Sequence, residues 1–292
     1  MSAFDSVAAP DVAQAEAAVE RGGPNLSLVV GGGLVGLVVL AALVSFVWTP
    51  HDPYFIGGGQ RLEGSSAEHW MGTDKFGRDI FSRLLVGART TLFVGVVSVG
   101  LAAVLGTPLG ILMGMAAGRT RDVLTRANDL LLAFPALLLA IMFGAVFGAS
   151  TTTAMIAIGI ATIPVFARIA RSATMQVMST EYILAARAAG RRRLAIAGRH
   201  VLPNISSLLL VQASVSFAIA VLAEAALSFL GFGTVPPIPS WGRMLQEAQD
   251  VLGVAPMQVV WPGLGIAIAV LGFNLLGDGL RDRYDPRLSD HQ

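Results

Sequence analysis

Long apolar stretches that contain no Asp, Glu, Lys or Arg alternate with polar segments along the chain. Five of these stretches cover residues 22–51, 90–118, 130–167, 200–223 and 251–277. A helix needs about 20 mostly apolar residues to cross a hydrocarbon core of about 30 Å. The pattern therefore predicts an all-α integral membrane protein whose helices cross the bilayer several times.

The third stretch is too long for a single crossing. Its 38 residues would form a helix of about 57 Å at a rise of about 1.5 Å per residue. We expect a break within the sequence FGASTTT, where Gly148 can end one helix and Ser150 or Thr151 can cap the next. This division predicts six transmembrane helices.

The composition supports a membrane protein and limits its chemistry. Of the 292 residues, 54% are hydrophobic and 13% are charged, whereas soluble domains carry roughly 25% charged residues. The absence of cysteine excludes disulfides and thiolate metal sites. The net charge of +1 does not indicate a nucleic-acid partner, because the charges are confined to particular loops.

The distribution of arginines predicts the orientation in the membrane. With six helices, segments 119–126, 168–199 and 281–287 fall on one side. Placing both termini in the cytoplasm puts fourteen of the 20 Lys and Arg residues there, as expected for short cytoplasmic loops. We therefore expect a multi-pass protein of the cytoplasmic (inner) membrane, in which residues 50–89 form an extracytoplasmic loop.

The sequence lacks the residues for several kinds of chemistry. A phosphate-binding loop would end in Gly-Lys-Ser/Thr, but the only lysine, Lys75, stands between Asp74 and Phe76. Any ATP hydrolysis must therefore come from a partner. The four histidines are scattered, with none at the i,i+4 spacing of a helical zinc site, so we expect no metal site. They are His51, His69, His200 and His291.

Glu224 is the one ionisable residue that could lie deep in a predicted helix. It stands about 18 residues into the fifth span, or about 27 Å along it, which predicts a position near the outer face. It is either an interfacial or loop-facing carboxylate or a pore or gate residue. No acid and base residues form a recognisable pair, so we expect no catalytic residue.

The segment from Tyr182 to Asn204 is strongly cationic and predicts a helical elbow. Gly190 can end a short alanine-rich helix, and Leu202-Pro203 can begin the fifth span. A helix without bulky side chains can pack closely on another protein, although the arginines could instead rest on lipid phosphates. The alanines are Ala185, Ala186, Ala188 and Ala189, and the expected buried residues after the turn are Leu194, Ile196 and Val201.

The spacing of Ala185-Ala186, Gly190 and Leu202-Pro203 resembles the EAA loop in the membrane subunits of type I ABC importers. In that family the loop forms the coupling helix, which docks into a cleft of the ATPase subunit. Two positions depart from the family pattern. Leu184 stands where glutamate is common, and His200 stands where isoleucine is common.

Three further stretches narrow the resemblance. They are HWMGTDKFGRDIFSRLLVGARTTL (69–92), EAALSFLGFG (224–233) and NLLGDGLRDRYDPRL (274–288). All three are similar to patterns in the C-type permease subunits of dipeptide and oligopeptide importers and their nickel-importing relatives. The resemblance implies the six-helix fold of type I ABC importer permeases (MetI-like) and peptide cargo, with nickel or another small solute as the alternative.

Each of these stretches also has a structural interpretation. In the first, the aspartates of two tight turns can bond nearby amides, or the motif can contact cargo or a delivering protein. Its residues are Gly72, Thr73, Asp74, Gly77, Arg78 and Asp79. The glycines and prolines of residues 231–239 predict a re-entrant or loop segment outside the membrane, which is possible if it packs against protein. The charged residues from Asp278 to Asp285 predict a charged helix terminus and a final turn at the inner surface.

The resemblance implies a complete transporter around this chain. The expected partners are a homologous permease, two ATPase subunits that hold ATP and Mg, an extracytoplasmic substrate-binding protein and membrane lipid. This chain itself would bind no cofactor and catalyse no reaction. A secondary transporter or channel acting alone is the other class, but it predicts mid-membrane polar sites and repeated halves, and neither is clear.

The predicted layout has five parts. They are an N-terminal cytoplasmic tail (1–24), a first anchor helix (25–49), the extracytoplasmic loop (50–89), a core permease domain of five helices (90–280) with the cytoplasmic coupling loop (168–204), and a C-terminal tail (281–292). Small residues in the second span predict close helix contacts, and three prolines predict kinks. These are Gly95, Gly100, Gly106, Gly110 and Gly114, with Pro108, Pro135 and Pro164.

Overall fold

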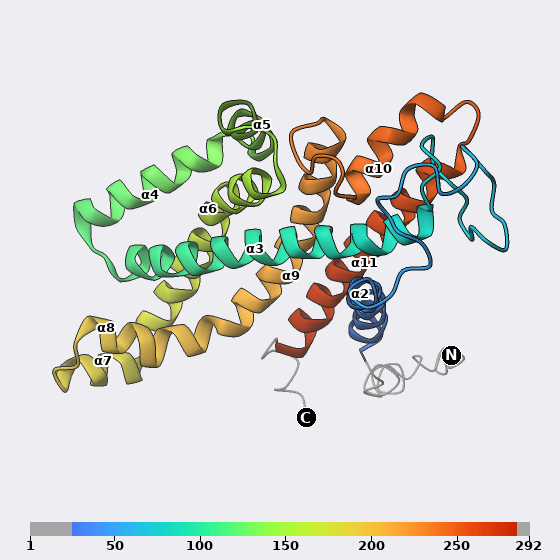
Figure 1. Ribbon diagram of the computed structural model, residues 1–292. Helices are drawn as coiled ribbons and strands as arrows, with labels where there is room; N and C mark the ends of the chain where they lie inside the picture. Colours follow the sequence, from blue (N-terminus) through green and yellow to red (C-terminus); the bar gives the residue numbers. More distant parts are fainter. Residues whose placement is uncertain (1–24, 285–292) are drawn as a thin grey trace, which may run out of the picture.

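The computed structural model describes residues 25–284 and is helical throughout its regular parts (Figure 1). The predicted tail 1–24 and residues from Asp285 onward lie outside the described residues. The helices are α2 (Leu26–Val44), α3 (Ile80–Met115), α4 (Gly118–Ala133), α5 (Ala136–Phe147), α6 (Thr151–Met178), α7 (Glu181–Ala188), α8 (Arg193–Ile196), α9 (Leu202–Phe229), α10 (Trp241–Ala248) and α11 (Met257–Tyr284). A π-helical turn, η1 (Ala197–Val201), precedes α9, and a 3₁₀ turn, η2 (Gln249–Val251), follows α10.

Five helical segments are long and apolar enough to cross a membrane, and a sixth crossing requires α4 and α5 to act as one bent span. These two helices meet at an angle of 79°. The bend lies at Pro135, where Phe134 is extended, because proline disfavours helical backbone in the residue before it. The sequence predicts an ordinary spanning helix from residue 130, but α5 has only 12 residues, about 18 Å at helical rise.

The predicted break between the third and fourth spans is confirmed. Gly148 ends α5 with a φ of 87°, in the left-handed region that glycine adopts without steric cost. The Ser150 side chain accepts a hydrogen bond from the amide of Thr153 at 3.0 Å and caps α6. Pro108 and Pro164 lie within the continuous helices α3 and α6, so of the three prolines only Pro135 marks a break.

Helix α3 begins at Ile80, well before residue 90, where the extracytoplasmic loop was expected to end. Asp79 starts the helix by accepting a hydrogen bond from the amide of Ser82 at 2.7 Å. The prediction from the sequence ends each span at a charged residue. Arg83, however, is buried inside the helix, with only 1% of its surface exposed. Its charge is accommodated by carboxylates from elsewhere in the chain.

Glycines allow α3 and α6 to pack with their backbones in close contact. A Cβ atom at Gly110 would lie 2.4 Å from the carbonyl oxygen of Ala167, and one at Gly114 would lie 2.6 Å from the Cβ of Thr174. Gly106 similarly faces the backbone of Ile163. The predicted close helix contacts are therefore confirmed at these three glycines, whereas Gly100 faces open space.

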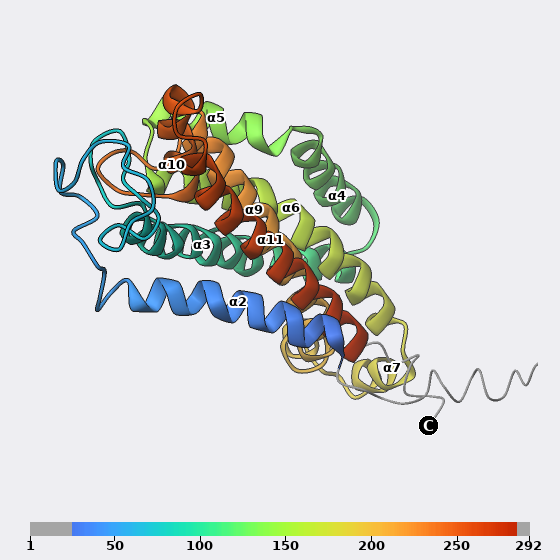
Figure 2. The ribbon, with the colours of Figure 1, turned by 90° about the vertical axis from the view of Figure 1, so that its right-hand side faces the viewer.

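The helical bundle has two opposite ends, which we call the α7 end and the α10 end (Figure 2). Helices α7 and α8 lie at the first, and α10 lies with the loop of residues 45–79 at the second (Figure 1). Helix α2 packs along α11, and the Asn25 side chain donates to Asp282 at 3.2 Å. The start of α2 and the end of α11 thus lie together, toward the α7 end (Figure 2).

Candidate functional site

Helix α7 presents a largely exposed surface at one end of the bundle. Of its residues, Ile183 is fully buried and packs in an apolar cluster with Ile196, Val201 and Ile205. The other side of α7 carries exposed Leu184, together with exposed Ala185 and Ala188. Ile183 therefore holds the helix on the bundle while the alanine face is open to a partner.

The end of α7 has the conformation that the sequence predicts. Gly190 has a φ of 74°, and its amide donates to the carbonyl of Arg187 at 2.9 Å. The amide of Arg191 donates to the carbonyl of Ala186 at 3.1 Å. These two bonds form a Schellman motif, which satisfies carbonyl groups that the helix end would otherwise leave unpaired. Gly190 reverses the chain and fixes where α7 stops.

The segment after the turn differs in part from the prediction. Ile196 and Val201 are buried as expected, but the prediction for Leu194 was wrong, since 81% of its surface is exposed. Pro203 lies within a helical run from Arg193 to Phe229, interrupted only by the π-helical turn η1. Proline cannot donate to the preceding turn, and the wider π turn lies directly before it.

At the α10 end, the Gly-Thr-Asp motif forms a tight turn. One carboxylate oxygen of Asp74 accepts hydrogen bonds from the amides of Phe76 at 2.8 Å and Arg78 at 3.0 Å. Gly72 and Gly77 both have positive φ, and a Cβ at either would collide with a backbone carbonyl of the loop. Gly72, Asp74 and Gly77 therefore shape this turn, and Thr73 within it is buried, with 0% of its surface exposed.

Asp79 joins three polar groups at the start of α3. Besides capping the helix, it contacts His69 at 3.0 Å and His51 at 3.8 Å through its other oxygen. The two histidine rings are 4.5 Å apart, so these residues are not scattered in the structure as they are in the sequence. The three ligand atoms lie within 4.8 Å of one another, against about 3.3 Å between ligands of tetrahedral zinc. The absence of a metal site stays a prediction.

A buried ionic network connects the motif to α10. Arg78 donates to Glu247 at 2.6 Å and to Asp74 at 2.6 Å, and Arg83 donates to the same Glu247 oxygen at 2.9 Å. Arg243 reaches the other oxygen of Glu247 at 3.2 Å. Glu247 could not be identified from the sequence, because its only local signal is its i,i+4 spacing from Arg243. Three arginines and two carboxylates thus hold the loop on the bundle.

Glu224 lies in α9, is fully buried and faces the loop before α10. Ser228 donates to one carboxylate oxygen at 2.7 Å, and Thr234 approaches the same oxygen at 3.3 Å. Thr91 of α3 donates to the other oxygen at 3.4 Å. The carboxylate thereby connects α3, α9 and the loop before α10. In that loop Gly233, Thr234 and Pro239 are buried, whereas residues 235–238 are exposed.

Known proteins similar to this chain are transport components. Residues 106–290 match the family described as "Binding-protein-dependent transport system inner membrane component". The dipeptide transport system permease protein DppC of Alkalihalophilus pseudofirmus is 43% identical over 90% of this chain and 87% of its own length. The glutathione transport system permease protein GsiD of Pectobacterium atrosepticum is 42% identical over 87% of this chain and 86% of its own.

The fold also has a solved counterpart. A chain from inward-facing structures of the MetNI methionine ABC transporter superposes with a TM-score of 0.59. The match covers 69% of this chain and 96% of that chain at 19% identity, so it shows a shared fold. The all-α fold that the sequence predicts is thereby confirmed. With the family match and the two permease relatives, these observations show that the chain belongs to the family of binding-protein-dependent transport system inner membrane components.

Proposed function

We infer that this chain is a permease subunit of an ATP-driven importer and that its cargo is a peptide. The observation that carries this conclusion is the similarity, over nearly the whole chain, to permeases named for dipeptide and glutathione transport. A permease is not an enzyme, and its ATPase resides on separate subunits. ATP and Mg would be bound by those partners, which agrees with the absence of a phosphate-binding loop in this sequence.

The exposed face of α7 is the surface that we assign to the ATPase subunit. It combines small side chains at Ala185 and Ala188 with an apolar one at Leu184. Buried Ile183 and the Gly190 turn make the helix a compact projection of the bundle. Movement of a docked ATPase subunit would then displace α7 as a rigid unit. Because α7 is connected to α6 and α9, this displacement would change the packing of those two helices.

We assign the α7 end to the cytoplasm and the α10 end to the outside. The arginines of α4, α7 and α8 and the turn between them support this orientation. The start of α2 and the end of α11 lie toward the α7 end, which supports cytoplasmic placement of both termini. The α10 end would then face the substrate-binding protein, and a second, homologous permease would complete the translocation pathway.

A nickel or other small-solute importer of the same family is the second candidate for cargo. No described side chain selects between these solutes, and the names of the two relatives favour peptides. A secondary transporter working alone is less well supported. Its first candidate residue would be Glu224, which is surrounded by hydroxyl groups of the same chain.

The first experiment is affinity purification of the tagged chain from native membranes, followed by mass spectrometry of the proteins that co-purify. Ala185→Trp places a bulky group on the proposed docking face, and Val254→Trp places the same group at an exposed position near the α10 end. We expect wild type and Val254→Trp to recover a second permease and ATPase subunits. Ala185→Trp should keep the second permease and lose the ATPase subunits.

Uptake assays then test the cargo and the energy source. Reconstituted transporter should accumulate a labelled dipeptide only with ATP, and unlabelled peptide should compete for uptake while Ni²⁺ should not. Competition by Ni²⁺ alone would favour the metal-importing alternative. A wild-type chain that purified alone and moved solute without ATP would contradict the importer assignment.

A further inference from the structure

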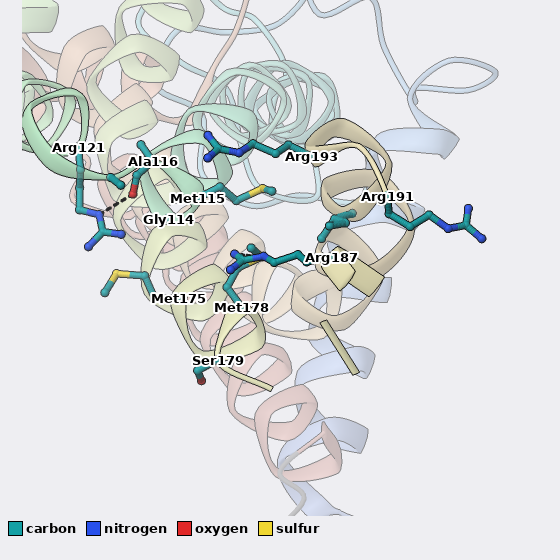
Figure 3. Close-up of a pocket in the computed structure, with 12 residues that line it drawn as sticks. Gly114, Met115, Ala116, Arg121, Met175, Met178, Ser179, Arg187, Arg191 and Arg193 are labelled. Carbon is teal, nitrogen blue, oxygen red and sulfur yellow. Dashed lines mark hydrogen bonds between the residues drawn. The ribbon is translucent and has the colours of Figure 1, made fainter. Parts of the chain in front are cut away.

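A cavity of about 570 Å³ opens at the α7 end, between the bundle and the helical elbow (Figure 3). Its walls are the C-terminal ends of α3 and α6, the first turn of α4, and the segments α7 and α8. Met115 and Met178, the last residues of α3 and α6, both line it. The cavity therefore lies where two helices that are long and apolar enough to cross a membrane end.

Three arginines from three different helices line this cavity. Arg121 comes from α4, Arg187 from α7 and Arg193 from α8, and the side chains of the last two extend toward the bundle in Figure 3. Arg191 also borders the cavity but points away from it (Figure 3). Arg121 is held in place because its Nε donates to the carbonyl of Ala116 at 2.8 Å.

The positive charge of this cavity has no counterpart within residues 25–284. None of its three inward arginines forms an ion pair with a carboxylate of that region. One turn before Met175, which also lines the cavity, the Nε of Arg171 is buried without a hydrogen-bond partner. The contrast is clear at the α10 end, where Arg78, Arg83 and Arg243 all contact carboxylates.

Apart from the arginines and Ser179, the residues that line the cavity are apolar or small, and this composition indicates which class of anion can bind. Met115, Met175, Met178 and Ile196 contribute side chains to the lining. Met175 is 41% exposed, and Leu112, one turn before the end of α3, is 56% exposed, so apolar surface continues away from the arginines. Guanidinium groups bind phosphate oxygens through several hydrogen bonds, and basic pockets between membrane helices bind lipid headgroups. An amphiphile matches this lining better than a free inorganic ion.

We propose that this cavity binds the phosphate headgroup of an anionic phospholipid. Its phosphate oxygens accept hydrogen bonds from Arg121, Arg187 and Arg193, and its glycerol and acyl portions lie on the methionines. The bound lipid bridges the ends of α3, α4 and α6 to the elbow. It therefore fixes the position of α7 relative to the bundle, which is a role separate from contact of the outer α7 face with a partner.

Two charge-matched variants test the proposal. Arg121→Gln, Arg187→Gln and Arg193→Gln together remove the inward charges, and the control combines Arg119→Gln, Arg192→Gln and Arg199→Gln. The control arginines are exposed and do not line the cavity. Each chain is purified in mild detergent, and native mass spectrometry with lipid extraction measures the retained phospholipid. Thermal unfolding is then followed during titration with phosphatidylglycerol, phosphatidylcholine or inorganic phosphate.

We expect wild type and the control to retain an anionic lipid and to be stabilised by phosphatidylglycerol, whereas phosphatidylcholine and inorganic phosphate have little effect. The cavity variant should bind phosphatidylglycerol at least about tenfold more weakly, because each basic contact contributes to headgroup affinity. Three results would overturn the proposal. In the first, wild type retains no anionic lipid and is not stabilised by phosphatidylglycerol. In the second, inorganic phosphate stabilises wild type as much as phosphatidylglycerol does. In the third, the cavity variant loses the ATPase subunits although it retains as much lipid as wild type.

If the cavity variant does not fold, the titration of wild type and the single change Arg121→Gln still test the proposal. Arg121 lies on α4, outside the coupling loop, and its removal should also weaken the response to phosphatidylglycerol. Wild type that responds equally to phosphatidylglycerol and phosphatidylcholine would show no preference for an anionic headgroup and would contradict the proposal. Neither result depends on the identity of the cargo.

Discussion

Arg78 donates a hydrogen bond to Glu247 at 2.6 Å, and this contact joins the loop before α3 to α10 across 169 positions of the chain. Arg83 shares the same carboxylate oxygen at 2.9 Å. Both guanidinium groups are almost completely buried, so their charges depend on Glu247 and Asp74 for compensation. The loop before α3 and helix α10 should therefore unfold together.

Replacing Glu247 tests this dependence. Glu247→Ala leaves two buried arginines with one carboxylate between them and should lower the free energy of unfolding by about 3 kcal/mol or more. Asp250→Asn is the control, because it removes an ion pair with Lys75 in which Asp250 is 74% exposed, and it should cost at most about 1 kcal/mol. Thermal unfolding of the purified chains measures both, and equal stabilities would contradict the structural role of the network.

The seam between α3 and α6 gives a second prediction. Gly110→Leu would force a side chain into the backbone of α6, since even a Cβ would meet the Ala167 carbonyl at 2.4 Å. We expect the free energy of unfolding to fall by about 1–3 kcal/mol, or the helices to fail to assemble, as in other overpacked interiors. Gly100→Leu, in the same helix, meets no atom within 4 Å at its Cβ and should leave stability unchanged. Fluorescence-detected size exclusion would compare the folded yields, and normal assembly of Gly110→Leu would exclude the close seam.

The sequence predicts much of this fold because charge-free runs and turn residues act locally. Gly148, Ser150 and Gly190 each adopt the conformation expected from their type, since a helix cap involves only neighbouring amides and carbonyls. The start of α3 could not be predicted in the same way. Arg83 is tolerated inside that helix through Glu247, a residue 164 positions away that no local pattern connects to it.

Other differences also come from tertiary contacts. His51 and His69 are separated in sequence, but the folded loop brings their rings within 4.5 Å of each other, at a tilt of 40°, beside Asp79. The sequence places Glu224 only by its distance along a helix, and its burial arises from Thr91 and Thr234, which belong to other segments. The alanine and glycine pattern of the elbow is readable from the sequence. The cavity behind it is not, because its arginines belong to α4, α7 and α8 and line one cavity only in the folded chain.

The turn after α7 yields a prediction about coupling. A Cβ at Gly190 would meet no other atom within 4 Å, so Gly190→Ala acts only through its positive φ, at a cost of about 1 kcal/mol. This small cost should loosen the end of α7 and lower the peptide transported per ATP hydrolysed, while the complex still assembles. Gly190→Asn should have a milder effect, because asparagine tolerates the left-handed region.

Gly198→Ala is the matched control for Gly190. Gly198 lies in the π turn and has no positive φ, and a Cβ added there would also meet no other atom within 4 Å. Its replacement should leave the ratio of transport to ATP hydrolysis at the wild-type value in proteoliposomes. Identical ratios for all three variants would show that the conformation of the α7 turn does not limit coupling.

Because Glu224 is surrounded by hydroxyl groups, two substitutions at this position can distinguish a structural role from a gating role. Glu224→Gln retains a side-chain oxygen that can accept from Ser228, Thr234 or Thr91, so this variant should fold and take up peptide like wild type. Glu224→Leu removes the acceptor and leaves buried hydroxyls unsatisfied, which should lower the free energy of unfolding by about 1–3 kcal/mol. Thermal unfolding and ATP-dependent uptake, measured on the same preparations, distinguish the two roles. A glutamine variant with normal stability and no uptake would show that transport requires a carboxyl group at position 224, and Glu224 would then be assigned to a gate.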